Sequence, residues 1–197
     1  MTAAASAWSG GWWAAARRID SPNFGPRPAD GAPPTLAIVH SISLPPGQYG
    51  GDEIERLFTN RLDWSAHPYF EQIRGATVSA HFLIRRDGEL LQFVSVDDRA
   101  WHAGRSSWGG RDECNDYSVG IELEGLEDHP FEPVQYEVLA TLLRELAMRC
   151  PIAQVVGHEH VAPSRKRDPG SAFDWRLLAT SLGWPDRCFP AGVLNAA

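Results

Sequence analysis

Short apolar runs alternate with amphipathic segments along most of the chain. Residues 36–40, LAIVH, have the length and β-branched content of a buried strand, and this strand ends in a histidine. Residues 78–94 indicate two strands joined at Asp87 and Gly88, because an Asp-Gly pair between alternating runs is a strong hairpin signal. Two further strands are expected at residues 118–125 and 154–158.

Helical periodicity appears in three places between and after these strands. Residues 52–60 bring apolar side chains onto one face every three to four positions, and Pro133–Arg149 form the longest amphipathic pattern of the chain. A last helix is expected over residues 172–182, with Ser171 as its N-cap and Gly183 at its C-terminal end.

Length and composition fit one domain. A chain of 197 residues with 43% hydrophobic content is long enough for one well-filled core but not for two ordinary domains. Strands interleaved with helices, together with a hairpin, predict an α/β fold in which helices pack on a mixed β-sheet. We expect a single domain over residues 1–197, with its core at about 16–184 and a loosely held tail at about 185–197.

Charge and cysteine content narrow the possible partners and the compartment. The formal net charge of −7 argues against nucleic-acid binding, which requires clustered Lys and Arg. No run of eighteen apolar residues predicts a membrane span, and the first residues make a poor signal peptide. The three cysteines are widely spaced and form no CxxC pair, which favours a reducing compartment. We therefore expect a cytoplasmic protein with no membrane or nucleic-acid partner. We also expect the protein to be a monomer.

Two predicted strands end in a histidine, His40 and His158. The second lies in GHEHVAPSRKRDPG, where Asp168 follows ten residues later. This segment could be an exposed polar turn or one wall of a metal site. Zinc accepts imidazole and carboxylate ligands, but a site would require ligands from distant parts of the chain. In the strand at 118–125, Glu122 falls on the side opposite to the alternating apolar residues.

Five segments carry a resemblance to a known family. They are AIVHSISLPPGQYGG, VSAHFLIRRDGEL, AWHAG, CNDYSVGIELEG and GHEHVAPSRKRDPGSAFDW, and they occur in order within about Ala16 to Leu178. These segments resemble the bacterial N-acetylmuramoyl-L-alanine amidases, zinc enzymes with the peptidoglycan-recognition-protein-like amidase fold. The resemblance implies hydrolysis of the amide between 1,6-anhydro-N-acetylmuramic acid and L-alanine, in cytoplasmic peptidoglycan recycling. An anhydromuropeptide is then the expected substrate.

The resemblance also implies roles for individual residues. The positions that match the family's Zn²⁺ ligands are His40, His158 and Asp168. Glu122 matches the catalytic glutamate, and Lys166 matches the lysine of the catalytic site. His160 matches no ligand position, so we expect it to be a surface residue or a donor to a neighbouring group.

The expected substrate contacts are Trp101 and His102, which match a segment that lines the family's cleft, and Ser41, which stands where the resemblance leads us to expect an asparagine. Thr77 and Glu113 stand where arginines suited to a peptide carboxylate are expected. Two other functions remain open. The chain could bind peptidoglycan without cutting it, but such binders lack a ligand that is present here. It could also act on intact wall outside the cytoplasm, which the poor signal peptide disfavours.

Overall fold

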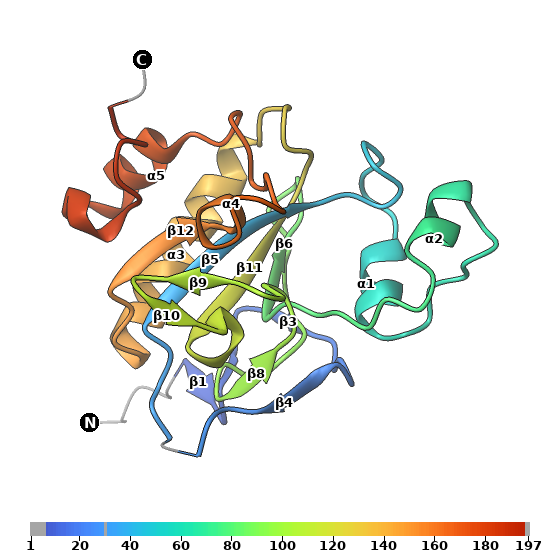
Figure 1. The fold of residues 1–197 in the computed structure, drawn as a ribbon, viewed down its shortest axis with the longest axis horizontal. Coiled ribbons are helices and arrows are strands. Elements are labelled where there is room, and N and C mark those ends of the chain that lie inside the picture. The colour runs from blue at the N-terminus through green and yellow to red at the C-terminus, as the bar shows by residue number, and fades with distance from the viewer. Residues whose placement is uncertain (1–6, 30, 196–197) are drawn as a thin grey trace.

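A six-stranded mixed sheet forms the centre of the molecule (Figure 1). The structure is a computed structural model that describes residues 7–29 and 31–195, so residues 1–6, 30, 196 and 197 of the predicted domain lie outside the described part. In spatial order the sheet contains β12 (Gln154–Gly157), β5 (Leu36–Ile42), β11 (Ser118–Glu124), β6 (Phe82–Ile84), β7 (Leu90–Gln92) and β3 (Arg17–Arg18). The first four strands run parallel to one another, while β7 is antiparallel to β6.

Three two-stranded ribbons surround this sheet. They are β1 (Trp8–Ser9) with β2 (Trp12–Trp13), β4 (Phe24–Pro26) with β8 (Asp98–Ala100), and β9 (Ser107–Trp108) with β10 (Arg111–Asp112). Two 3-10 helices, Cys114–Asp116 and Asp186–Cys188, complete the connections.

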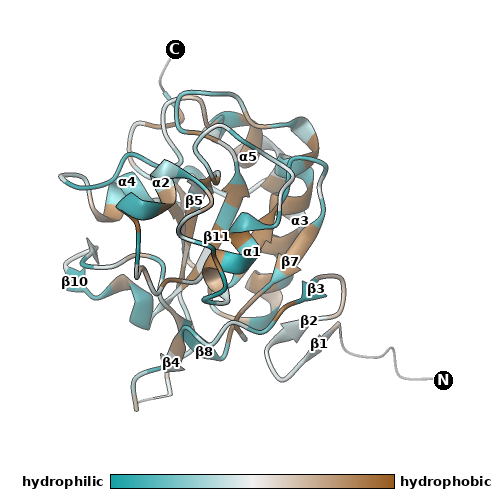
Figure 2. Cartoon of the chain, turned by 90° about the vertical axis from the view of Figure 1, so that its right-hand side faces the viewer, coloured by the Kyte–Doolittle hydropathy of each residue, from teal (hydrophilic) through white to brown (hydrophobic). Residues whose placement is uncertain are grey.

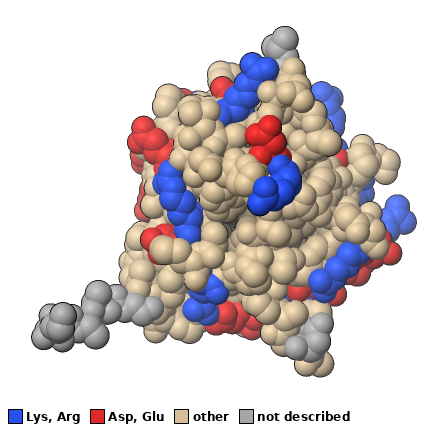
Figure 3. Space-filling model, turned by 90° about the vertical axis from the view of Figure 1, so that its left-hand side faces the viewer, with Lys and Arg blue, Asp and Glu red and all other residues tan. Residues whose placement is uncertain are grey.

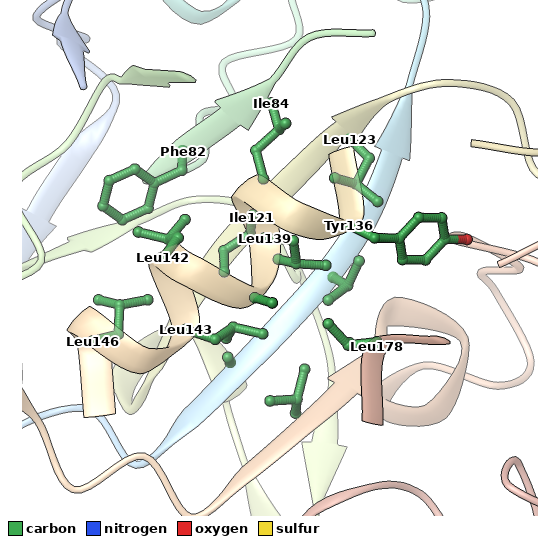
Figure 4. Packing of buried hydrophobic residues seen from close by; sticks show 14 of the residues in the cluster. Phe82, Ile84, Ile121, Leu123, Tyr136, Leu139, Leu142, Leu143, Leu146 and Leu178 are labelled. Carbon is green, nitrogen blue, oxygen red and sulfur yellow. The ribbon is translucent and has the colours of Figure 1, made fainter. Parts of the chain in front are cut away.

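One face of the sheet is covered by α3 (Pro133–Arg149) and α5 (Trp175–Leu182). Figure 4 shows the leucines of α3 pointing toward the apolar side chains of β6 and β11. The main contacts of this layer come from Leu139, Leu142, Leu143 and Leu146 against Phe82, Ile121 and Leu123. Figure 2 shows that hydrophobic residues are concentrated on the strands and on α3. The predicted amphipathic helix at 133–149 is confirmed.

The other side of the molecule carries α1 (Glu53–Phe58) and α2 (Pro68–Gln72), which stand beyond β6 in Figure 1. Ile54, Leu57 and Phe58 are buried, as the periodicity of residues 52–60 predicts. They pack on side chains of β6 and β7 in a second apolar cluster. Hydrophobic periodicity does not predict α2, because its five residues are too few to show a helical period.

Strand alternation assigns different residues to the two faces of the sheet. In β11, Val119, Ile121 and Leu123 face α3, so Gly120 and Glu122 face the opposite way. All seven residues of β11 are buried, since the central strand is covered on both faces. The polar face predicted for this strand is therefore mostly covered by protein.

Three local expectations are corrected. Asp174, not Ser171, caps α5: its side chain accepts a hydrogen bond from the backbone N–H of Leu177 at 2.8 Å, and the helix begins at Trp175. The segment after residue 185 is not loosely held, because Phe189 is 3% exposed and belongs to the main apolar cluster. Gly183 ends α5 in a left-handed conformation, as expected.

The third correction concerns the strand predicted at 154–158. It ends at Gly157, and His158 opens the short helix α4 (His158–Val161). The N–H of Gly157 donates to Nδ1 of His160 at 3.0 Å, which turns the chain out of the sheet. His158 thus lies one residue past the strand but at the same edge of the sheet.

Surface charges of both signs are interspersed on the face in Figure 3. Acidic and basic side chains lie next to each other there, without a continuous basic stripe. None of the helices in the described residues is long and apolar enough to cross a membrane.

Candidate active site

The carboxyl ends of β5, β11 and β12 meet at one edge of the sheet. His40 lies near the end of β5, and its register partner in β11 is Glu122. Gly157 of β12 pairs with Val39, so the next residue, His158, follows at the level of His40. Ligands commonly bind at the carboxyl ends of parallel strands, because several strands and the loops after them converge there. Strand pairing alone therefore brings together residues that are more than a hundred positions apart.

Three buried side chains form a triangle at this edge. Nδ1 of His40 lies 3.0 Å from Nδ1 of His158, and Oδ2 of Asp168 lies 3.1 Å from each of these nitrogens. The described residues hold one such group that could bind a metal ion. All three predicted ligands are brought together, with exposed fractions of 1%, 2% and 6%.

The protonation of His158 fits a metal at the centre of the triangle. Its Nε2 lies 3.1 Å from the carbonyl oxygen of Ala103, which can only accept a hydrogen bond. When this ring is neutral, its proton is therefore on Nε2, and Nδ1 presents its lone pair to the nearby atoms of His40 and Asp168. Tetrahedral zinc with bonds of about 2.0–2.2 Å separates its ligands by about 3.3–3.6 Å, slightly more than observed. A small expansion of the triangle accommodates the ion.

The electrostatics of the triangle also favour a cation. Burial, helped by the neighbouring His158, lowers the pKa of His40 to about 4, so its ring is neutral at pH 7. Burial alone would raise the pKa of Asp168, but the imidazoles of His158 and His40, 3.1 Å away, outweigh burial and hold that pKa well below its usual range. Two imidazoles and one carboxylate are a donor set that zinc accepts.

Glu122 lies beside the triangle and is 8% exposed. Burial raises its pKa well above the usual value, the charge of Asp168 raises it further, and Lys166 partly opposes both. Its Oε2 is buried and has no hydrogen-bond partner among the described residues. Burying a carboxyl oxygen without a hydrogen-bond partner costs free energy unless a ligand or water molecule supplies the missing hydrogen bond. This oxygen is therefore free to interact with water or substrate.

A cleft of about 480 Å³ opens above the triangle. Lys166, half-buried, lines it together with Ser41 and Trp101, so these predicted residues do meet at one site. The wall on the side of α1 and α2 is apolar and is formed by Leu57, Phe58, Tyr69, Ile73 and Val78. Tyr69 lies in α2 and Ile73 is the C-cap of that helix, which the sequence did not reveal.

His102 also lines the cleft, but both of its ring nitrogens face protein atoms. Its Nδ1 is 3.0 Å from Nε2 of His40, and its Nε2 is 3.3 Å from Oγ of Ser118. Burial lowers the pKa of His102 well below its usual value, with the neighbouring His40 and His81 adding to the effect. This ring is neutral and is bound to the protein at both nitrogens.

His160 lies outside the triangle. Its side chain is half-buried: Nδ1 accepts a hydrogen bond from the backbone N–H of Gly157, and the ring meets that of Trp175 edge-on, with the two ring centroids 5.6 Å apart. Thr77 and Glu113, the positions where arginines were expected, are not among the residues that line the cleft. Glu113 instead lies 3.5 Å from Arg99.

Two supporting residues were missed by sequence reasoning. Oδ1 of Asn115 accepts hydrogen bonds from the backbone N–H groups of His102 and Ala103. Nη2 of Arg165 donates to the carbonyl of Ala103 at 2.7 Å. Both residues hold the segment whose carbonyl fixes His158. Asn115 lies within the CNDYSVGIELEG motif, which was a usable signal, whereas Arg165 had only a short basic cluster around it.

Residues 30–171 match the family described as N-acetylmuramoyl-L-alanine amidase. A 1,6-anhydro-N-acetylmuramyl-L-alanine amidase, AmpD of Citrobacter freundii, is 52% identical over 175 residues, which cover 86% of this chain and 93% of that protein. The chain belongs to the N-acetylmuramoyl-L-alanine amidase family. The resemblance seen in the five sequence segments and the expected amidase activity are thereby confirmed.

Solved structures of amidases support the fold. The crystal structure of a selenomethionine AmpD derivative has a TM-score of 0.86 at 50% identity, covering 88% of this chain and 98% of that one. The complex of AmiD from Escherichia coli with anhydro-N-acetylmuramic acid-L-Ala-D-gamma-Glu-L-Lys has a TM-score of 0.55 at 30% identity, covering 79% and 60% of the two chains. The predicted single-domain amidase fold, a mixed sheet with helices packed on it, is confirmed.

Proposed function

We propose that this amidase hydrolyses the amide between the lactyl group of 1,6-anhydro-N-acetylmuramic acid and L-alanine, with zinc as its cofactor. The observation that carries the proposal is the buried triangle of His40, His158 and Asp168, with Glu122 beside it at the floor of a cleft. Relatives named for this anhydro substrate, and an amidase of similar fold in complex with it, support the choice of substrate.

The three ligands would hold zinc, which supplies a Lewis acid that polarises the amide carbonyl and lowers the pKa of water. Glu122 accepts a proton from the attacking water as the C–O bond forms at the carbonyl carbon. It then gives this proton to the alanine nitrogen as the C–N bond breaks. The products are the carboxylic acid of the anhydro sugar and a peptide with a free amino group. The raised pKa of Glu122 suits a group that must both take and return a proton.

Lys166 is proposed to stabilise the oxyanion that develops on the carbonyl oxygen. Its side chain lines the same cleft, and its ammonium group offers a positive charge for this role. Ser41 and Trp101 are proposed substrate contacts. The indole of Trp101 is half-buried at the cleft and offers a flat face for a sugar ring. His102 contributes to the same wall, with its ring nitrogens already engaged by the protein.

We further propose that the protein works as a cytoplasmic monomer in peptidoglycan recycling. All proposed catalytic and metal-binding residues come from one chain, so the site needs no second subunit. Cys114, Cys150 and Cys188 are free thiols, which suits a reducing compartment. Recovery of the protein from the periplasm in a fractionation experiment would contradict this location.

Mass spectrometry of the reaction products tests the function. Purified protein is incubated with 1,6-anhydro-N-acetylmuramyl-L-Ala-D-gamma-Glu-L-Lys, with and without a chelator. We expect the free anhydro sugar acid and a tripeptide that begins with L-alanine, and no products after zinc is removed. An unchanged substrate would contradict the proposed activity, and cleavage within the peptide would contradict the proposed bond.

A further inference from the structure

His102 connects a proposed metal ligand to the central strand of the sheet. Its Nδ1 lies 3.0 Å from Nε2 of His40, and the two rings meet edge to face with centroids 5.0 Å apart. On its far side, Nε2 of His102 lies 3.3 Å from Oγ of Ser118, the first residue of β11. We propose that His102 is a positioning residue that accepts a hydrogen bond from Nε2–H of His40 and so fixes the tautomer and ring orientation in which His40 binds zinc.

The positions of the protons on His40, His102 and Ser118 determine the direction of each hydrogen bond between them. The inference rests on the proposed zinc site, in which Nδ1 of His40 must present a lone pair to the metal. The proton of the neutral ring is then on Nε2, which faces Nδ1 of His102. Nδ1 of His102 must accept, so the proton of His102 is on Nε2 and is donated to Ser118. Every contact then has one donor and one acceptor.

The opposite arrangement would block the site. If Nδ1 of His102 carried the proton and donated it, Nε2 of His40 would have to accept. The proton of His40 would then be on Nδ1, which points at Asp168 and His158 inside the triangle. A metal could bind only after this proton left or moved. An acceptor at His102 therefore favours the tautomer of His40 that binds metal.

Packing holds the ring of His102 in place. A Cβ atom on Gly120 would lie 2.4 Å from Cγ of His102, so the imidazole rests directly on bare backbone in β11. Asn115 accepts a hydrogen bond from the backbone N–H of His102 at 3.2 Å. The position of His102 is thus fixed by packing of its ring on Gly120 and by the hydrogen bond of its backbone N–H to Asn115. Histidine ligands usually donate their second N–H to an acceptor that orients them, and loss of that acceptor typically weakens metal binding about 10–100-fold.

His158 shows that the two histidine ligands use different acceptors. Its Nε2 donates to a backbone carbonyl, that of Ala103, which no side-chain substitution removes. His40 depends instead on a side chain. The affinity of the site for zinc is therefore sensitive to the identity of residue 102 through His40.

Two substitutions separate the acceptor from the packing. His102→Phe keeps a ring of similar shape but has no acceptor, whereas His102→Asn keeps an amide oxygen near the position of Nδ1. We expect zinc to bind about 10–100-fold more weakly to His102→Phe than to the wild type. His102→Asn should regain most of this loss. The dissociation constants are measured by competition with a chromophoric chelator, independently of amidase activity.

Each outcome bears on the inference. Equal zinc affinity of His102→Phe and wild type would overturn it, and so would an equal loss in both variants, because packing alone would then explain the effect. If His102→Phe does not fold, ¹⁵N NMR of the zinc-loaded wild type decides: Nδ1 of His102 should be unprotonated and Nε2 protonated, and the reverse would overturn the inference. A zinc-binding wild type without amidase activity would contradict the proposed function but leave this inference standing.

Discussion

Glu122 lies directly opposite His40 in the parallel register of β11 and β5. The register runs from the pair Ser118 and Leu36 to the pair Glu124 and Ile42 without interruption. Both side chains therefore point to the face of the sheet that does not carry α3. A slip of one residue would turn Glu122 into the apolar layer. One strand pairing thus sets the distance between the proposed base and a proposed metal ligand.

The first prediction concerns the ligand set. Alanine substitutions of His40, His158 or Asp168 should abolish stoichiometric zinc binding, because each removes one of the three converging atoms. His160→Ala should retain zinc, since that ring binds Gly157 and Trp175 instead. Elemental analysis of purified variants provides the measurement. Zinc lost from His160→Ala but kept by His158→Ala would reverse the assignment.

The second prediction concerns Lys166. Lys166→Ala should keep zinc and substrate affinity but lower kcat by about 10²–10³, as expected for a donor that acts mainly in the transition state. Arg167→Ala is a matched control, because this neighbouring cation is exposed and does not line the cleft. Steady-state kinetics on both variants provide the comparison. A rise in KM with unchanged kcat would instead make Lys166 a ground-state substrate contact.

The third prediction concerns stability against acid. His81 is fully buried; burial, with some help from Arg27, lowers its pKa from 6.5 to about 3. Below pH 6.5 the unfolded chain binds a proton on His81 that the folded chain excludes. The contribution of His81 to stability is therefore present above pH 6.5 and is lost as the pH falls toward 3. His81 alone should cost about 2 kcal/mol of unfolding free energy between pH 7 and pH 5.

Urea unfolding of zinc-free protein at the two pH values tests this dependence. His81→Gln removes the titrating group, while its amide can still donate toward the carbonyl of Asp98 that the histidine uses. The variant should lose about 2 kcal/mol less than the wild type between pH 7 and pH 5. His40 and His102 titrate in both proteins, so their effects cancel in the difference. Equal losses in the two proteins would contradict the prediction.

The fourth prediction concerns a buried ion pair near the end of β11. Glu124 is 3.0 Å from Arg85 and also accepts from the backbone N–H of Gly50 at 2.7 Å. Glu124→Ala should lower the unfolding free energy by about 3–5 kcal/mol, because it leaves Arg85 buried with fewer partners. The exposed pair of Glu71 and Arg74 offers a control, and Glu71→Ala should change stability little. Similar effects of the two substitutions in urea unfolding would contradict this.

Much of the fold could be predicted from local patterns. The strand at 36–40, the hairpin turn at Asp87 and Gly88, and the helix at 133–149 each carry a periodic or turn signal that does not depend on the rest of the chain. The short helices α2 and α4 carry no such signal, because four or five residues do not complete enough turns. Burial of Phe189 depends on contacts with a distant cluster, which local composition does not reveal.

The convergence of His40, His158 and Asp168, the proposed metal ligands, could be predicted because each of the three matches a ligand position of the family, and strand ends explain why they meet. The arrangement around them could not be predicted. Whether His102 faces substrate or His40 depends on a ring orientation that is set by Gly120 and Ser118 in another strand. The hydrogen bond from Arg165 to the carbonyl of Ala103 likewise joins segments about sixty residues apart. Such contacts follow from the assembled sheet and not from spacing along the chain.

Glu122→Gln tests the account most directly, because it separates proton transfer from metal and substrate binding. The amide keeps the shape of the side chain but cannot take a proton from water. Zinc content, substrate Kd and the rate of amide cleavage are measured on one preparation of this variant and of the wild type. We predict unchanged zinc and Kd with a rate lower by at least about 10²–10⁴. Near-normal turnover by Glu122→Gln would contradict the mechanism, and loss of zinc would show that Glu122 is a ligand instead of the base.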